Sequence, residues 1–367
     1  MLESSFYKDR KVLITGHTGF KGSYMCKVLL ELGAQVWGYA LDPPTQPSLF
    51  ELCSLSNEVN SARGDIRDLE SLKKVFEEAK PEIVIHMAAQ PIVRTSYEKP
   101  VETFETNVMG TVNVLECCRS TDSVRSVINV TTDKVYRNNE WDRGYVETDA
   151  LGGYDPYSNS KSCSELVTES YINSFLRDKG IAVSACRAGN VIGGGDFAKD
   201  RIIPDCVRAM EKKEEIIVRN PYSTRPFQHV LEPVCAYLMT ASGQYLDPSL
   251  AGCYNVGPDD TDCYTTGELV SLFCDKWNSR AEEWGGCMAS WKNVSDNGPH
   301  EAGFLKLDSS KLKKTFGWRP VWNVERAMEE IVEFSGAWLR GEDAGKVLTE
   351  TVSSYMRTIH KQIGAGG

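Results

Sequence analysis

The stretch "RKVLITGHTGFKGSYMCKVLLELG", residues 10–33, predicts a strand, a glycine-rich turn and a helix in immediate succession. Its first six residues contain the apolar and β-branched run "VLIT", residues 12–15, which is typical of a buried strand. Gly16, Gly19 and Gly22 follow, and the helical spacing of apolar residues then continues to Gly33. Such glycines let backbone amides approach a pyrophosphate at the positive N-terminus of a helix. We therefore expect this turn to bind a dinucleotide, because a strand precedes it and a helix follows it.

Strands and helices continue to alternate after this unit. Further strands are predicted at residues 34–42, 81–89, 127–130 and 181–189, with a weaker one inside 58–68, and helices at 69–80, about 101–120 and 155–178. The strands are apolar on both faces, which indicates a parallel sheet covered by helices on each side. The fold class is therefore α/β, a doubly wound Rossmann-type sheet.

The pattern changes after residue 190, where loops become frequent and helices are expected near 231–242, 265–276, 308–315 and 323–339. We expect a smaller mixed α/β lobe there that forms one wall of a substrate cleft. The predicted organisation is a dinucleotide-binding domain at 1–189 that carries the catalytic residues, a substrate-binding lobe mainly at 190–340 with some segments returning to the first domain, and a helical tail at 341–367.

Composition narrows the class of protein. The chain has 367 residues, 41% of them hydrophobic and 25% charged, with a net charge of −10, which is typical of a globular protein and argues against nucleic-acid or membrane-surface partners. No apolar run approaches the ~20 residues of a membrane span, and the N-terminus lacks the apolar segment of a signal peptide. The twelve cysteines are scattered through apolar runs, and Cys117–Cys118 is the one close pair. We expect reduced core thiols in a cytoplasmic protein and no metal site.

Two acids follow strands at the predicted cofactor edge. Asp42 follows the second strand, where a carboxylate hydrogen-bonds a ribose diol and repels a 2′-phosphate, which favours NAD over NADP. The alternative is a turn acid in front of Pro43. Asp65, after the third strand, is placed to meet the adenine end. The predicted cofactor site also includes Phe20, Ile66, Ala88 and Ala89.

The segment "YDPYSNSK" places Tyr157 and Lys161 four residues apart on a predicted helix, so both side chains lie on one face. An ammonium beside a phenol favours the phenolate and lowers the pKa of the phenol from ~10. A phenolate can take the proton of an alcohol while a hydride leaves the same carbon. Alone, this spacing is common on solvated helix faces; a glycine-rich turn earlier in the chain makes it specific.

The segment "VTTDKVY", residues 130–136, ends a buried strand in two hydroxyls, an acid and an amine. An acid beside an amine suits proton transfer in two directions. The alternative is a solvated ion pair at a strand end, which contributes little to stability.

Taken in order, "ITGHTGFKGS", "GDIRD", "HMAAQP", "VTTDKVY", "YDPYSNSK" and "RPFQHV" resemble the extended short-chain dehydrogenase/reductase family over nearly the whole chain. Within it, "LDPPTQPSLFEL", "CRAGNVIGGGD" and "RNPYSTRPFQHVLEP" resemble the nucleotide-sugar 4,6-dehydratases that act on CDP-glucose. The resemblance implies that NAD takes a hydride from C4 of the hexose, that water is lost across C5 and C6, and that the hydride returns to C6. The product would be a 4-keto-6-deoxy sugar, an intermediate for the deoxysugars of lipopolysaccharide O-antigen.

The resemblance also implies a role for each polar residue of the site. Tyr157 would be the base at O4, Lys161 its electrostatic partner and a ribose ligand, and Thr132 a hydrogen-bond partner at O4. Asp133 would protonate the leaving C6 hydroxyl. Lys134 would remove the C5 proton at a position where dTDP-glucose dehydratases carry Glu, and it can do so only when neutral. The next candidates for this base are Glu165 and Asp196.

For the substrate, the resemblance places Asn190 and Arg225 at the diphosphate and Arg94 at the rim of the site. Glu301 and Ala302 stand where dTDP relatives carry basic residues, which is consistent with a cytosine rather than a thymine ligand.

The family also implies a homodimer, or a dimer of dimers, built through the helices near 101–120 and 155–178. The apolar residues Val112, Leu115, Leu166 and Val167 fit such an interface, or equally packing on the sheet. Rival functions are another nucleotide-sugar 4,6-dehydratase, a UDP-sugar 4-epimerase, which needs no acid–amine pair after the threonine, and a dinucleotide-sensing regulator without turnover.

Overall fold

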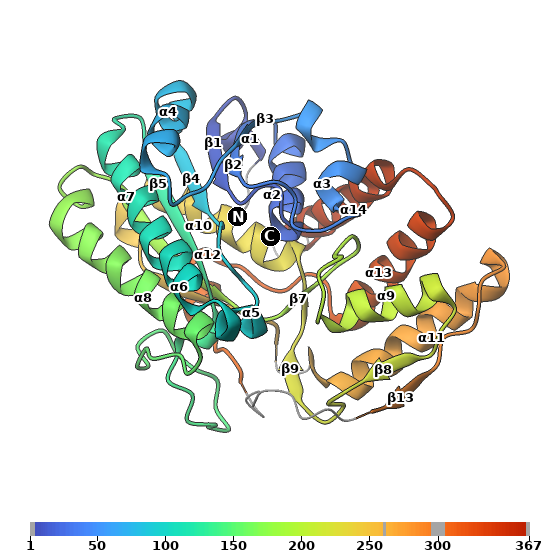
Figure 1. The fold of residues 1–367 in the computed structure, drawn as a ribbon. Helices are drawn as coiled ribbons and strands as arrows, with labels where there is room; N and C mark the ends of the chain where they lie inside the picture. The colour runs from blue at the N-terminus through green and yellow to red at the C-terminus, as the bar shows by residue number, and fades with distance from the viewer. Residues whose placement is uncertain (1–3, 260–261, 295–304, 365–367) are drawn as a thin grey trace.

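The computed structural model describes residues 4–259, 262–294 and 305–364. These residues build a seven-stranded sheet in the order β11-β6-β5-β4-β1-β2-β3, and every neighbouring pair in it is parallel (Figure 1). The predicted doubly wound fold is confirmed. The order reverses between β1 and β4, and a crevice for ligands is expected at the carboxyl ends of strands at such a point.

The strands of the central sheet are β1 (Lys11–Thr15), β2 (Gln35–Ala40), β3 (Asn60–Arg63), β4 (Ile83–His86), β5 (Ser126–Thr132), β6 (Ala182–Ala188) and β11 (Cys253–Val256). Three two-stranded pairs lie outside it: β7 (Val191–Ile192) with β10 (Gln228–His229), β9 (Thr224–Pro226) with β12 (Cys263–Thr265), and β8 (Ile216–Val218) with β13 (Trp291–Asn293).

The helices are α1 (Ser4–Tyr7), α2 (Phe20–Glu31), α3 (Leu49–Leu52), α4 (Leu69–Ala79), α5 (Val93–Glu98), α6 (Pro100–Phe104), α7 (Gly110–Ser120), α8 (Pro156–Tyr171), α9 (Ile202–Lys212), α10 (Leu231–Leu246), α11 (Thr266–Trp284), α12 (Ser310–Phe316), α13 (Val324–Leu339) and α14 (Ala344–Gly364). Short 3₁₀ turns are η1 (Leu55–Asn57), η3 (Asp133–Val135) and η5 (Pro248–Leu250), and π turns are η2 (Glu105–Met109) and η4 (Ile172–Leu176).

Two hydrophobic cores sandwich the sheet, because successive strand residues point to opposite faces. Val12 and Ile14 of β1 pack with α2, α10 and α14 on one face, and Leu13 packs with α4, α7 and the π turn η4 on the other. A separate core joins α9, α11 and α13 in the second lobe (Figure 1).

The sequence-based assignment missed one strand of the sheet. β11 pairs with β6 although its residues were assigned to the loop-rich region, because only Tyr254 and Val256 carry its apolar pattern. The helix expected at 101–120 is also interrupted: the π turn η2 lies between α6 and α7. In the part of the chain that the structure describes, no helix has the length and apolar character to span a bilayer.

Candidate active site

The glycine-rich turn joins β1 to the start of α2. Gly16 has a φ of +80°, and a Cβ there would lie 2.8 Å from the backbone of Ala88 after β4. A Cβ on Gly22 would lie 2.2 Å from the Gly16 carbonyl oxygen, so both glycines are required by packing. Gly19 differs, because the nearest atom to its virtual Cβ is 3.5 Å away and it caps α2 without a side-chain hydrogen bond. A Cβ at Gly19 would therefore make only ordinary contact, and a glycine at a helix N-terminus without a side-chain cap leaves the backbone amides accessible to a ligand phosphate.

Of the remaining predicted cofactor residues, Phe20, Ala88 and Ala89 lie beside this cradle, and Ile66 follows β3. Phe20 begins α2, and Ala88 and Ala89 follow β4, where the backbone N–H of Ala88 donates to the Thr15 hydroxyl at 3.2 Å. Ile66 is buried, and its side chain occupies the space that a Cβ on Gly110 of α7 would need.

Asp42 and Asp65 both have arginine partners from the β3 edge. The Asp42 side chain is 90% exposed, and its Oδ1 lies 3.2 Å from Nε of Arg63. Asp65 binds Arg67 through both carboxylate oxygens, at 2.6 Å for the shortest contact, and these hydrogen bonds lower its pKa below the ordinary value. The structure thus places Asp42 at the sheet edge near the cradle, but its carboxylate lies in solvent beside a guanidinium.

The polar end of β5 leads directly into the turn η3. The Thr132 hydroxyl donates to Asp133 Oδ1 at 2.8 Å, and Lys134 Nζ donates to the same oxygen at 3.1 Å. The other carboxylate oxygen of Asp133 is buried and has no protein partner among the described residues. It points toward the backbone position of Gly189, where a virtual Cβ would lie 3.5 Å away. An unpaired buried oxygen is costly, so a ligand hydroxyl is a natural partner for it.

The helix α8 begins at an Asp155 cap and presents the Tyr–Lys pair to the end of β5. The Lys161 Nζ donates to the Val130 carbonyl at 3.1 Å. Burial lowers the pKa of Lys161 to about 8, and Glu165 opposes this effect. Burial raises the pKa of Tyr157 above its ordinary value, and Lys134 together with a hydrogen bond to Thr132 opposes the rise.

The expectation that Lys161 lowers the pKa of Tyr157 is therefore corrected in two respects. The phenol is desolvated, so its pKa is raised in the unliganded protein, and the main cation acting on it is Lys134. The Lys161 ammonium is turned toward the β5 backbone instead.

The surroundings of Lys134 favour its charged form. Burial lowers its pKa, but the Asp133 carboxylate and Tyr157 outweigh burial and raise the pKa above the ordinary lysine value. The predicted substrate residues lie close to it. The Lys134 Nζ contacts Asn190 Oδ1 at 3.4 Å, and Arg225 of β9 is near enough for its charge to act on Lys134. Arg94 is half-buried on α5.

The two reserve candidates for the C5 base are both held in ion pairs. Glu165 lies behind β5 in a buried pair with Arg187, and Asp196 binds Arg201 at 3.0 Å and the Ala198 amide. Glu301 and Ala302 lie outside the described residues.

Sequence reasoning missed a lysine that enters the same site. Lys21, in the first turn of α2, donates to the Tyr237 hydroxyl of α10 at 3.4 Å. Burial lowers the pKa of Lys21 to about 7, with further lowering by Arg201 and Lys161 and an opposing effect of Asp133. Lys21 is therefore within electrostatic range of Lys161 and Asp133. The sequence signal that could have identified Lys21 was its position between Gly19 and Gly22 of the glycine-rich turn.

No group of His, Cys, Asp and Glu within the described ranges could hold a metal ion. The glycine cradle, the Tyr157–Lys161 helix and the hydroxyl-rich end of β5 define an extended short-chain dehydrogenase/reductase. The family model described as GDP-mannose 4,6 dehydratase matches residues 13–331. The chain belongs to this family, and its substrate is a nucleotide sugar.

Comparison with individual proteins agrees with this family. The chain is 47% identical over 362 residues to CDP-glucose 4,6-dehydratase of Salmonella typhimurium (strain LT2), a match that covers 97% of this chain and 99% of that enzyme. The structure of UDP-glucose 4-epimerase of Thermus thermophilus in complex with NAD matches with a TM-score of 0.73 at 26% identity, covering 90% of this chain and 99% of that one. A dTDP-glucose 4,6-dehydratase from Bacillus anthracis in complex with NAD shares the fold, with a TM-score of 0.71 at 21% identity over 88% of this chain and 96% of that one.

Proposed function

We propose that the chain catalyses the NAD-dependent dehydration of CDP-glucose to CDP-4-keto-6-deoxyglucose. The observation that carries this proposal is the Asp133–Lys134 contact of 3.1 Å at the end of β5. Tyr157 lies close enough to affect the pKa of Lys134. An elimination needs an acid and a base on neighbouring carbons, whereas epimerisation at C4 needs neither. The Salmonella CDP-glucose 4,6-dehydratase, 47% identical, supports the choice of substrate.

The cofactor is NAD, and the residues present fit it. The backbone amides at Gly19 and at the start of α2, which has no side-chain cap, would receive its pyrophosphate, and Lys161 would bind its nicotinamide ribose. When bound, NAD supplies the acceptor and donor of the hydride that moves from C4 to C6. Asp42 would meet the adenosine ribose after a rotation away from Arg63.

The first proton to move is that of the sugar O4 hydroxyl. Tyr157 takes it as the hydride leaves C4, with Thr132 sharing a hydrogen bond with the phenol. Because its pKa is raised, Tyr157 is protonated at neutral pH and cannot accept a proton, so the positive charge of Lys134, and that of NAD when bound, would be needed to favour the phenolate at this step.

The second step is the loss of water across C5 and C6. In the ion pair, the Lys134 ammonium donates a hydrogen bond to the Asp133 carboxylate. Lys134 cannot act as a base in this state because its amine is already protonated. Transfer of that proton from Nζ to the carboxylate gives a neutral amine and a neutral acid together, and exclusion of water by the substrate favours this neutral pair. The amine then takes the C5 proton, the acid protonates the C6 hydroxyl as it leaves as water, and the ion pair is restored. As the hydride reaches C6, the Lys134 ammonium returns a proton to C5, and the proton that Tyr157 took from O4 restores the charge of Lys134.

The substrate is held from the second lobe. Asn190 and Arg225 would bind the diphosphate, and Arg94 would lie at the rim of the site. Residues 1–189 then form the domain with the cofactor and catalytic groups, residues 190–340 mainly the nucleotide-sugar lobe, and residues 341–367 a helical tail.

The test is incubation of the purified chain with CDP-, dTDP-, GDP- and UDP-glucose, followed by mass analysis of the sugar. Loss of one water from CDP-glucose in preference to the others is the expected result. An unchanged mass with inversion at C4 would instead identify an epimerase, and loss of water from a different nucleotide would move the substrate assignment.

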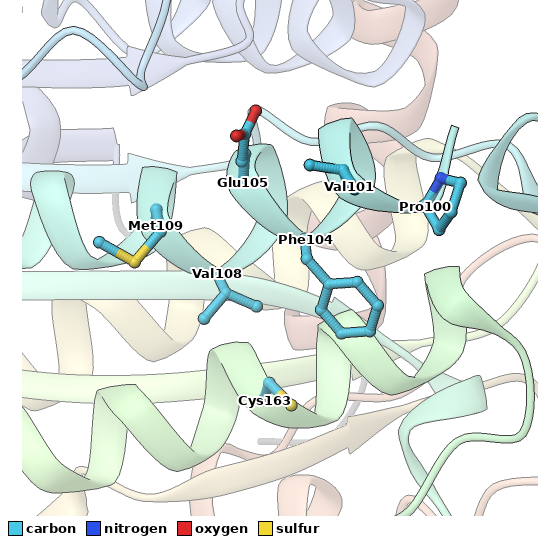
Figure 2. Close-up of a pocket in the computed structure, with 7 residues that line it drawn as sticks. All are labelled: Pro100, Val101, Phe104, Glu105, Val108, Met109 and Cys163. Atoms are coloured by element: carbon cyan, nitrogen blue, oxygen red, sulfur yellow. The ribbon is translucent and has the colours of Figure 1, made fainter.

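The chain is further proposed to form a homodimer through α6–α8. Figure 2 shows Phe104 and Val108 pointing toward the helix that carries Cys163, and this apolar groove is lined by Pro100, Val101, Phe104, Glu105, Val108, Met109 and Cys163. Val101 and Met109, which line this groove, are 69% and 52% exposed, and Leu166 of α8 is 54% exposed. Leu115, in contrast, packs on the sheet.

The compartment proposed is the cytoplasm. The twelve cysteines all lie within the described residues and form no disulfide there, as expected in a reducing environment.

A further inference from the structure

A buried ion pair lies directly behind the end of β5. Glu165 of α8 and Arg187 of β6 meet through two contacts from Nε, at 3.0 and 2.9 Å, and one from a terminal nitrogen at 2.5 Å. Their side chains are 3% and 4% exposed. A buried ion pair is seldom more stable than well-packed apolar residues of the same volume. The pair therefore needs an explanation other than stability.

Glu165 lies one helical turn after Lys161 on α8, and both side chains bind consecutive residues of β5. The Lys161 Nζ donates to the Val130 carbonyl at 3.1 Å, and the Thr131 hydroxyl donates to Glu165 Oε1 at 2.6 Å. The helix is thereby fixed to the strand immediately before the Thr132–Lys134 turn.

Arg187 holds the carboxylate in this position. It is the register partner of Thr131, and its Nη1 atom donates to the Tyr136 hydroxyl at 2.7 Å and to the Glu147 carbonyl at 3.0 Å. With its donors directed to three acceptors on different segments, the guanidinium cannot rotate, and Glu165 cannot turn away from Lys161.

We propose that the Glu165–Arg187 ion pair is a positioning pair that holds the Lys161 ammonium in place and keeps it charged for cofactor binding. The inference rests on the proposed function, in which Lys161 binds the cofactor ribose. Glu165 touches neither cofactor nor substrate and acts through Lys161.

The charges around Lys161 support this role. Burial lowers its pKa to about 8, and Glu165 is the negative group that opposes burial. His86 on β4 is buried with a pKa lowered to about 3, so it stays neutral, and Lys21 on α2 carries the same sign as Lys161. Without Glu165, burial would favour a neutral Lys161.

The test measures the dissociation constant of NAD between pH 6 and pH 10, a readout that does not depend on turnover. In the wild type, NAD affinity should fall as pH rises through the pKa of Lys161. In Glu165→Gln the midpoint of this fall should move to lower pH, by about one pH unit. In Arg187→Gln the unpaired Glu165 carboxylate should move it to higher pH.

Two further variants keep the result clear. Thr131→Val removes one hydrogen bond to Glu165 without changing any charge, so its midpoint should match the wild type. If either single variant does not fold, the neutral pair Glu165→Gln/Arg187→Gln replaces it, and its midpoint should lie below that of the wild type because Glu165 is the nearer charge.

Opposite shifts in the two single variants, or the lowered midpoint of the double variant, would support the proposal. A purely structural pair would weaken binding without moving the midpoint, and that result overturns it. Lys161→Met distinguishes the proposed role of Lys161 in cofactor binding from the proposed role of the Glu165–Arg187 ion pair. If Lys161→Met abolishes the fall in NAD affinity with pH while Glu165→Gln leaves its midpoint unchanged, Lys161 binds the cofactor but the Glu165–Arg187 pair has no role in keeping it charged. If the fall persists in Lys161→Met, the assignment of Lys161 to the cofactor fails and this inference fails with it.

Discussion

The Lys134 ammonium lies 3.1 Å from the Asp133 carboxylate, so the proposed base of the elimination is hydrogen-bonded to its proposed acid. Because Asp133 and Tyr157 raise the pKa of Lys134, the amine stays protonated at neutral pH. The arrangement therefore requires one proton to cross this contact before the C5 proton can be taken.

Substitution of Lys134 distinguishes a base from a fixed charge. Lys134→Arg keeps the positive charge but cannot release a proton near neutral pH. We expect Lys134→Arg to oxidise C4 and then stall with reduced cofactor, whereas Lys134→Met should oxidise C4 more slowly, because the charge that favours the Tyr157 phenolate is lost, and then stall at the same point. Exchange of the C5 hydrogen with deuterated water, followed by mass spectrometry, should be lost in both. Retained elimination in the arginine variant would make Lys134 an electrostatic stabiliser instead.

Tyr157→Phe should stop the reaction one step earlier. Removal of a general base typically lowers the rate by ~10²–10⁴-fold, and here it should abolish the appearance of reduced cofactor at about 340 nm on addition of CDP-glucose. The circular dichroism spectrum should be unchanged because one hydroxyl is lost. Thr132→Val is a matched comparison that removes the hydrogen-bond partner and should reduce the same step less. Normal turnover by the phenylalanine variant would exclude Tyr157 as the base.

The Asp42–Arg63 contact of 3.2 Å predicts how the chain discriminates between NAD and NADP. Asp42→Ala removes the charge that repels a 2′-phosphate and leaves Arg63 in place to bind one. We expect the ratio of NADP to NAD affinity to rise roughly tenfold, about 1.4 kcal/mol, in equilibrium binding. The double variant Asp42→Ala/Arg63→Ala should lose the gain. An unchanged ratio in Asp42→Ala would show that Asp42 is a turn acid.

The features that could be predicted from the sequence are those set by the spacing of residues within one turn or one helix. The glycines of residues 16–22 and the Tyr157–Lys161 pair each lie within one turn or one helix, so their geometry follows from the element that carries them. The ion pair between Glu165 and Arg187 joins residues 22 positions apart on different elements, and no local pattern indicates it.

The orientation and the burial of the Asp42 and Lys161 side chains could not be predicted from the sequence either. It placed Asp42 after β2 but could not show that the carboxylate is 90% exposed. It placed Lys161 beside Tyr157, yet burial and the Val130 carbonyl decide where the ammonium lies and which cation acts on the phenol. β11 was missed because four residues carry too short a pattern, and pairing with β6 defines it.

Glu232 predicts a loss of stability with rising pH. It is fully buried on α10, accepts the Val321 and Trp322 amides, and burial raises its pKa to about 7. Between its ordinary value and pH 7, the folded chain holds a proton that the unfolded chain releases, so stability falls as pH rises through this window. The full effect is roughly 3 kcal/mol. Relative to wild type, Glu232→Gln should be more stable at pH 8 than at pH 5 in thermal unfolding. The exposed Glu211→Gln should show no such difference, and an equal response of both variants would refute the assignment.

The exposed apolar face of α6 and η2 predicts the oligomeric state. If Val101 and Met109 are covered by a second copy, the wild type should have twice its chain mass of 40.9 kDa in light scattering at micromolar concentration. Val101→Asp/Met109→Lys places charges that a dry helical interface cannot solvate, so we expect a folded monomer. Leu246→Asp is the matched control, because Leu246 is 71% exposed at the end of α10, away from this face, and its loss should leave the dimer intact. A wild-type chain that is already monomeric, or a double variant that stays dimeric, would exclude this face as the interface.

The comparison of dimer and monomer also bears on catalysis, because α8 carries both Tyr157 and the groove residue Cys163. Reduced turnover in the monomer with unchanged NAD affinity would then indicate that the partner copy holds α8 in its active position.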